Sequence, residues 1–302
     1  MSFRAALHLA LWFLLVAALG GCSSLPFMNG KAGDAEPQVQ REPQFRLEVD
    51  APSDLAKLLR EHLDLARLQY AAEADALTRS EIDRLIGAAS SQALSLLQTE
   101  GYFNPVVKVV RVEDGAEPPL LRMSVTPGPR ATIERLTLEV QGGLYDEVAA
   151  GDAQAAALSN ALQSEWALQP GRPFQQSAWD SAKNRVLASL RSNGYLSAQW
   201  SGTAAQINAD TNSVRLFVVA DSGELFRVGS IRTAGLQRFD EGAVLPAARE
   251  LLGKAATEQT LRDVQDRLLN LGLFESVVID VDAASTDPAR AEALLALREL
   301  PL

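Results

Sequence analysis

The sequence has very few of the residues from which catalytic and metal-binding sites are usually built. It contains one cysteine, Cys22, and two histidines, His8 and His62. A zinc site needs several Cys or His ligands, and a cysteine nucleophile needs a histidine base, so this set provides neither. An internal disulfide is excluded as well. We therefore predict that the chain is not an enzyme and that it needs no metal or cofactor.

A basic surface is also missing. The 302 residues include 28 Lys and Arg against 38 Asp and Glu, which gives a net charge of −10. Nucleic acid is therefore not an expected partner, because binding a phosphate backbone needs a positive field. Hydrophobic residues make up 47% of the chain, which is enough to form the cores of two or three domains.

Long apolar runs are absent apart from one near the start. Arg4 precedes an apolar stretch from Leu7 to Leu19, and Gly20, Gly21 and Cys22 follow. This order is typical of a secretory signal, which we assign to residues 1–21. A transmembrane anchor is disfavoured, since spanning a bilayer needs about 20 apolar residues.

The end of this segment, Leu19 to Cys22, resembles a lipobox, in which the cysteine becomes lipidated and amino-terminal. The alternative is that Cys22 is incidental to an ordinary cleavage site. Acyl chains would hold the chain to a bilayer at about 0.8 kcal/mol per buried CH₂. Ser23, rather than Asp, follows the cysteine, and the resemblance then implies the outer membrane. Residues 22–43 have no helical or strand period, and we predict a flexible tether.

The rest of the chain repeats one pattern three times. Each copy has a long amphipathic stretch, a glycine, bulky residues and then alternating apolar residues. The three landmarks are Gly101-Tyr102-Phe103, Gly194-Tyr195-Leu196 and Gly272-Leu273-Phe274. We predict that each glycine ends a helix in a left-handed cap. We also predict that two of the long helices start at the Ser-x-x-Asp pairs Ser80/Asp83 and Ser177/Asp180.

Each copy also has a strand-like run before its helices, at Phe45–Val49, Ile133–Val140 and Phe226–Thr233. The predicted order is thus β-α-α-β-β, an α+β module with a three-stranded sheet covered on one face by two helices. We place the three modules at residues 44–129, 130–225 and 226–302.

This order resembles the POTRA (polypeptide-transport-associated) domain, and the motifs resemble the three-POTRA region of TamA-like assembly factors in the Omp85 superfamily. The motifs are Gly101-Tyr102-Phe103, the Asp221-Ser222-Gly223 segment running on to Gly229, and Leu271 to Val277. The resemblance implies a periplasmic protein, anchored to the outer membrane, that takes part in outer-membrane assembly and autotransporter secretion. Its expected partners are client polypeptides and a periplasm-spanning protein.

In relatives of this kind a β-barrel follows, and we expect one after Leu302 in a full-length relative. The alternative is a barrel-less lipoprotein that serves as an envelope scaffold.

The resemblance also implies that the strand after the second helix lies at an edge of each sheet, where an added strand could pair with it. By position these edges are Val106–Val112, Ser197–Ile207 and Ser276–Val281. The candidate partner-binding residues are Val106, Val107, Val109, Val277, Val278 and Ile279.

Other conspicuous residues have structural interpretations. We expect core packing for the aromatic residues Tyr102, Phe103, Trp166, Trp179, Tyr195 and Phe274. Asp210, Asp221 and Asp240 have neither EF-hand spacing nor a paired base, and we expect them in turns. Gly142-Gly143 is expected at the end of a strand, since no phosphate-loop pattern surrounds it. His62 is expected on a helix surface.

Overall fold

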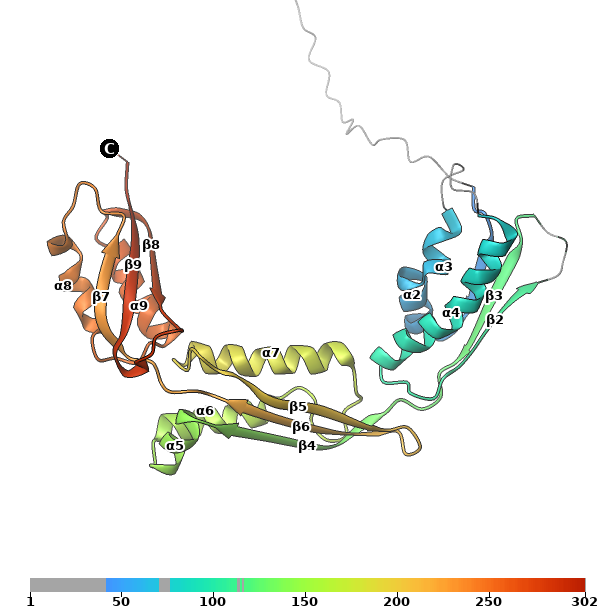
Figure 1. The fold of residues 1–302 in the computed structure, drawn as a ribbon, viewed down its shortest axis with the longest axis horizontal. Helices are drawn as coiled ribbons and strands as arrows, with labels where there is room; N and C mark the ends of the chain where they lie inside the picture. Colours follow the sequence, from blue (N-terminus) through green and yellow to red (C-terminus); the bar gives the residue numbers. More distant parts are fainter. Residues whose placement is uncertain (1–41, 71–76, 113–114, 116, 302) are drawn as a thin grey trace, which may run out of the picture. The chain divides into compact units, whose positions relative to one another are not determined.

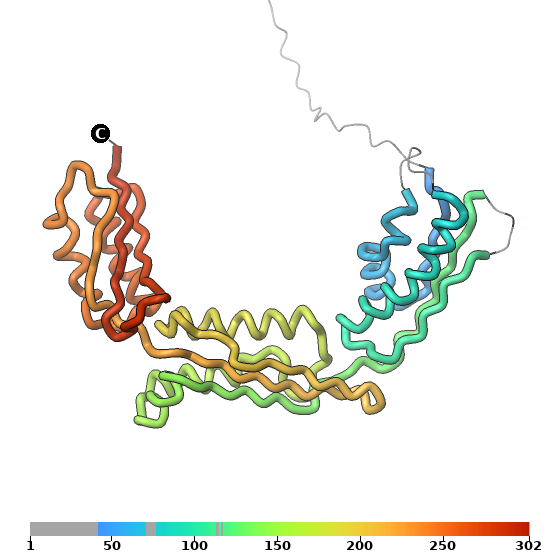
Figure 2. Tube along the Cα trace, viewed as in Figure 1, coloured from blue at the N-terminus to red at the C-terminus, as the bar shows by residue number. Residues whose placement is uncertain are grey.

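The computed structural model of the chain describes residues 42–70, 77–112, 115 and 117–301. It contains three separate three-stranded sheets, each covered on one face by helices (Figure 1). The predicted signal, Cys22 and nearly all of the predicted tether lie outside the described residues. The tube in Figure 2 follows the same path three times, strand, helices and then two strands. This confirms the predicted α+β class with three β-α-α-β-β modules.

The first module contains β1 (Arg46–Asp50), α2 (Ser53–His62), α3 (Asp64–Arg67), α4 (Arg79–Thr99), β2 (Val106–Val112) and β3 (Leu120–Thr126). The second module contains β4 (Thr132–Gln141), α5 (Gly143–Ala149), α6 (Ala153–Ser164), α7 (Gln176–Ser192), β5 (Gln199–Asn208) and β6 (Ser213–Asp221). The third module contains β7 (Val228–Ala234), α8 (Leu245–Ala248), α9 (Glu258–Leu269), β8 (Phe274–Val281) and β9 (Ala291–Glu299).

All three sheets have the same topology, because the last strand of each module lies in the centre. The strand orders are β1-β3-β2, β4-β6-β5 and β7-β9-β8. In each sheet the first strand runs parallel to the central strand, and the hairpin partner runs antiparallel to it. Each central strand alternates buried and more exposed residues, as Val214, Leu216 and Val218 do in β6. One face of every sheet therefore packs on helices.

The long helices begin earlier than their sequence suggests. α4 starts with Thr78 as N-cap, in a capping box with Glu81, so the predicted start at Ser80 and Asp83 is wrong. α7 has Gln175 as N-cap, with no side-chain cap bond, so the start at Ser177 and Asp180 is wrong as well. In α4 a threonine and a glutamate satisfy the first amides better than a serine and an aspartate two residues later.

The helix ends follow the glycine prediction. Gly101, Gly194 and Gly272 all have positive φ, at 87°, 95° and 68°. After α4 the Tyr102 N–H donates to the Leu97 carbonyl at 3.0 Å, the long bond of a Schellman cap, and Tyr195 repeats it after α7 with Leu190. These bonds use carbonyls that the end of a helix otherwise leaves free.

The same glycine motif joins neighbouring modules. The Gly101 carbonyl accepts a hydrogen bond from Ala131 at 2.8 Å, and the Gly194 carbonyl accepts one from Phe226 at 2.9 Å. Of the two bulky residues that follow, the first packs on its own module, as Tyr102 does. The second packs on the next module: Phe103 contacts the core of the second module, with its ring 5.9 Å from Phe174.

Leu196 repeats this arrangement by packing on the core of the third module. The aromatic residues Trp166, Trp179, Tyr195 and Phe274 are buried as predicted. Phe103 is also a packing residue, but the core it packs against belongs to the following module. After Gly101 and Gly194, the first residue thus completes its own module and the second connects it to the next.

Candidate partner-binding strand edges

The strands proposed from the sequence as partner-binding edges do lie at sheet edges. β2, β5 and β8 each pair on one side only, with β3, β6 and β9. β5 begins at Gln199, two residues later than expected, because Ser197 and Ala198 belong to the turn after α7. Each edge presents backbone N–H and C=O groups that no strand among the described residues satisfies.

Edge β2 divides its valines between the two faces of its sheet. Val107 and Val109 are half-buried and pack on the first core, whereas Val106 and Val110 are more than half exposed, at 54% and 53%. Arg111 reaches toward α4, where it pairs with Asp83 at 3.1 Å. Val107 and Val109 are therefore structural, and among the predicted residues of this strand only Val106 presents its side chain to solvent.

Edge β8 also divides its side chains between the two faces of its sheet. Val277 is buried in the third core and Ile279 is half-buried against it, whereas Val278 is 58% exposed. Four of the six predicted partner-binding side chains thus point toward helices. A partner that adds a strand here would be held by the backbone of β2 or β8, and by side chains such as Val106 and Val278 on the outer face.

Charge is unevenly distributed over the three edges. Lys108 and Arg111 lie on β2, and Glu275 and Asp280 lie on β8. β5, which reads Gln-Trp-Ser-Gly-Thr-Ala-Ala-Gln-Ile-Asn, has no charged residue and no proline over 10 residues. Charges and prolines are the usual protection of an edge strand against pairing with another chain. β5 is therefore the edge most open to strand addition.

The sequence analysis included this strand among the edges but took no individual residue from it. The sequence did indicate an unprotected edge here, because no Asp, Glu, Lys, Arg or Pro occurs between Gln199 and Asn208. Most of its side chains are small and exposed, and a bulge lies between Trp200 and Gly202. Small, uncharged side chains leave the backbone accessible along the strand.

The Asp221-Ser222-Gly223 motif has a structural role at the start of α5. The Ser222 hydroxyl is fully buried and accepts a hydrogen bond from the Leu144 N–H at 3.0 Å. The Asp221 carboxylate accepts one from the Gly223 N–H at 2.9 Å, and the Gly143 N–H donates to the Gly223 carbonyl. Gly142 and Gly143 thus do lie at a strand end, where they connect β4 to a helix that the sequence analysis missed.

Tyr195 also holds α5 in place, through a residue further along the helix than those bonded to Ser222 and Gly223. Its hydroxyl donates to the Glu147 carboxylate at 2.5 Å. Burial, and then this acceptor carboxylate, raise the pKa of the Tyr195 hydroxyl well above its usual range. The phenol therefore stays protonated and acts as a hydrogen-bond donor that connects α5 to the segment after α7.

The remaining candidates occupy structural positions. His62 is exposed at the end of α2, Asp210 lies in the turn between β5 and β6, and the Asp240 carbonyl accepts from the Ala243 N–H in a turn.

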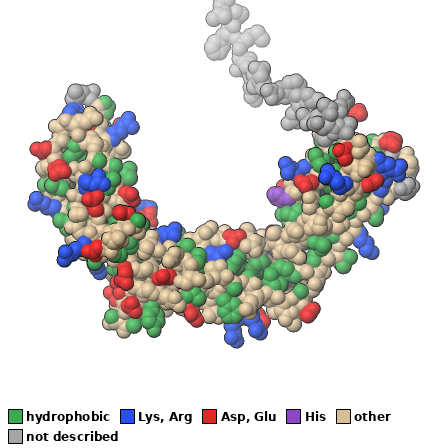
Figure 3. Space-filling view, viewed as in Figure 1, with side chains coloured by type: hydrophobic (Ala, Val, Ile, Leu, Met, Phe, Trp, Pro, Cys, Tyr) green, Lys and Arg blue, Asp and Glu red, His purple; other side chains and the backbone are tan. Residues whose placement is uncertain are grey.

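Within the described residues no three His, Cys, Asp or Glu side chains gather as metal ligands would. Figure 3 shows acidic and basic side chains mixed over the face in view. In the part of the chain that the structure describes, no helix has the length and apolar character needed to cross a bilayer.

Comparison with known proteins finds similar structures but no matching family model. The POTRA3-5 region of BamA from Haemophilus influenzae is similar at a TM-score of 0.43 and 17% identity, over 85% of this chain and 96% of that one. POTRA1-3 of Omp85 from Anabaena is similar at a TM-score of 0.30 and 17% identity, over 85% and 95%. CdiB from Escherichia coli is similar at 0.29 and 16%, over 75% of this chain and 36% of CdiB.

Proposed function

We propose that this chain is the periplasmic POTRA region of an outer-membrane protein and autotransporter assembly factor, and that it binds client or partner polypeptides by β-strand addition. The observation that carries the proposal is the β5 edge, 10 residues long without a charge or a proline. An unfolded outer-membrane protein can pair with such an edge through its backbone, whatever its sequence.

The composition of the molecule supports weak, reversible binding. The net charge of −10 gives no broad positive field to capture a client by charge. Each backbone hydrogen bond contributes about 1 kcal/mol net, so a short added strand is held with modest affinity and can be released. We propose that the role is non-enzymatic, since one cysteine and two histidines leave little from which to build a cysteine nucleophile with a histidine base.

The proposal includes the place where the protein acts. The Cys22 thiol would carry the lipid, and the chain from Ser23 onward would hold the modules in the periplasm at the outer membrane. A lipid anchor at one end leaves the sheet edges free to meet polypeptides that cross the periplasm.

The test uses two neighbouring prolines in β5, Thr203→Pro and Ala204→Pro. Adjacent residues of a strand point their N–H groups to opposite sides, so one proline removes a bond to β6 and the other removes an outward N–H. Thermal melting identifies the variant that keeps its sheet. A benzoylphenylalanine at Gln206 then measures crosslinking to a urea-unfolded outer-membrane barrel protein diluted into buffer.

We expect the folded proline variant to crosslink about fivefold less, since loss of one hydrogen bond of about 1 kcal/mol changes affinity by that factor. The matched control is valine at the same position, Thr203→Val or Ala204→Val, because it changes the side chain and keeps the N–H. If the folded proline variant crosslinks as strongly as the parent, and equivalent pairs in β2 and β8 do too, strand addition at these edges is wrong.

A further inference from the structure

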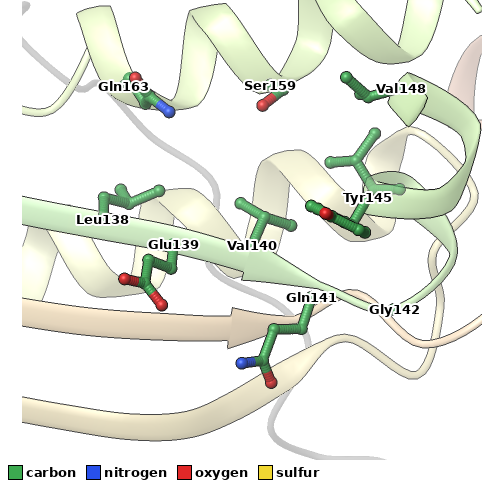
Figure 4. Close-up of a pocket in the computed structure, with 10 residues that line it drawn as sticks. Leu138, Glu139, Val140, Gln141, Gly142, Tyr145, Val148, Ser159 and Gln163 are labelled. Atoms are coloured by element: carbon green, nitrogen blue, oxygen red, sulfur yellow. The ribbon is translucent and has the colours of Figure 1, made fainter. Parts of the chain in front are cut away.

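A groove lies on the opposite side of the second module, between strand β4 and helices α5 and α6. Its volume is about 560 Å³, and its lining includes Leu138, Val140, Tyr145, Val148, Ser159 and Gln163. Figure 4 shows the Leu138 and Val140 side chains pointing from β4 toward the helices, with Ser159 and Gln163 across from them. Tyr145 and Val148 close one end, and Glu139 and Gln141 point away.

β4 is itself an edge strand, and most of its length is open. The segment after α6 covers only its start, where the Ile133 N–H donates to the Arg172 carbonyl and the Phe174 N–H donates to the Ala131 carbonyl. From Leu136 to Gln141, β6 is the sole strand paired with β4 among the described residues. The backbone groups on the groove side are therefore available to another strand.

The corresponding first strands of the other modules are shorter than β4. β1 has five residues. β7 has seven, and its first residue, Val228, is already bonded to Gly253 and Lys254. β4 has 10 residues, so it is the longest of the three first strands.

The side chains around the open edge define what an added strand should carry. Leu138 and Val140 are half-buried, and Tyr145 is 62% exposed, so apolar surface faces an unfilled space. A strand beside β4 would place every second side chain in this space, under α6, and the others beside Glu139 and Gln141. Its inward side chains should therefore be apolar.

The charges near the groove are acidic. Glu139 is the single charged residue of the lining, and Asp146 lies nearby in the first turn of α5. Within the described residues neither carboxylate has an ion-pair partner. Figure 3 shows acidic side chains beside apolar ones at the end of the second module where α5 lies. A Lys or Arg opposite Glu139 would form a favourable cross-strand pair.

We infer that the β4 groove is a second strand-addition site, and that it takes an extended segment with apolar residues on one face and Lys or Arg on the other. The inference depends on the proposed function, strand addition, and assigns it a separate place and a partner chemistry. The site is distinct from the β5 edge, since β4 and β5 lie on opposite sides of β6.

The test uses a synthetic nine-residue peptide that alternates Leu or Val with Lys or Thr, titrated into the isotope-labelled chain while backbone amide shifts are recorded. We expect shifts at Leu136–Gln141 and along α6. A peptide N-methylated at every residue should lose the effect, because it keeps the side chains and has no N–H left to donate from either edge. A peptide with Glu in place of Lys should bind about threefold more weakly, as expected for a cross-strand charge pair.

Two variants of α6 localise the binding. Ser159→Trp places an indole in the groove and should weaken the Lys peptide at least tenfold, whereas Asn160→Trp, on the exposed side of the same helix, should leave binding unchanged. Shifts confined to β2, β5 or β8 would overturn the β4 inference and leave the proposed function standing. Equal binding of the N-methylated peptide would also overturn it. Absence of shifts at every edge would count against both.

Discussion

The joint between the first and second modules leads to a sharp prediction, because Phe103 belongs to one module in sequence and to the next in packing. The Phe103 ring packs on the second core beside Phe174. Truncating a fully buried Phe costs about 3 to 5 kcal/mol, and Phe103 is only half-buried. We therefore expect Phe103→Ala to destabilise the second module by about 2 kcal/mol, or about 10 °C in Tm.

The tryptophans allow this module to be observed by itself. The chain has four tryptophans, and Trp166, Trp179 and Trp200 belong to the second module. The fourth, Trp12, lies in the predicted signal, and Trp12→Phe removes its contribution. Urea unfolding followed by tryptophan fluorescence then reports the second module specifically, even if the three modules unfold separately.

The control is the preceding residue. Tyr102 packs on the first core, so Tyr102→Ala should shift circular-dichroism signals from the first module and move the tryptophan transition much less. A tryptophan transition that moves by under about 0.5 kcal/mol in Phe103→Ala would refute the reasoning, since that is the size of an ordinary surface substitution. The Phe103–Phe174 contact would then contribute nothing to the second module.

Three further predictions concern the anchor, a carboxylate and the glycine caps. Cys22→Ser should abolish labelling by a palmitate analogue and leave the precursor uncleaved, and equal labelling of both forms would contradict the lipid anchor. The Glu299 carboxylate accepts hydrogen bonds from the Gln237, Arg238 and Phe239 amides, and these hold its pKa at about 2, below the ordinary 4.5. Because this pKa is lowered by folding, its stabilisation is complete above about pH 4.5 and is lost as the pH falls toward 2. The Tm difference between the parent and Glu299→Gln should shrink over that range, whereas a constant difference would contradict the role of the charge. Gly272→Val should cost about 1 to 2 kcal/mol, because valine is strained at positive φ, and its Cβ would meet no other atom. Gly101→Val should destabilise the protein more, because its Cβ would also lie 2.5 Å from the Phe174 carbonyl oxygen. Equal urea midpoint shifts for the two would contradict the steric argument.

Features that depend on local sequence were predictable. The repeats identified the β-α-α-β-β order, and the position of each glycine identified the end of a long helix with positive φ. Both depend on residues close together in the chain, where periodicity and backbone preference act directly. The edge position of β2, β5 and β8 also followed, since it was expected from the resemblance in module order.

Features that depend on distant residues were not predictable in this way. Helix α5 is only seven residues long, and its first amides are satisfied by Ser222 and Gly223, far along the chain. A helix this short has little stability by itself, so its sequence carries a weak signal. The groove beside β4 depends in turn on where α5 and α6 lie relative to the strand. Likewise, the pairing register of each hairpin decides on which face of the sheet the Val107 and Val277 side chains lie.

The packing of Phe103 and Leu196 on following modules limits how such an array can be shortened or rearranged by recombination. Deleting the second module would place Phe103 against a core that is now contacted by the smaller Leu196. A phenyl ring in a site shaped for an isobutyl group is overpacked, at about 1 to 3 kcal/mol. Exchange of modules between genes should therefore succeed when the crossover lies just before this residue, between Tyr102 and Phe103 or between Tyr195 and Leu196, so that each core keeps the side chain that fits it.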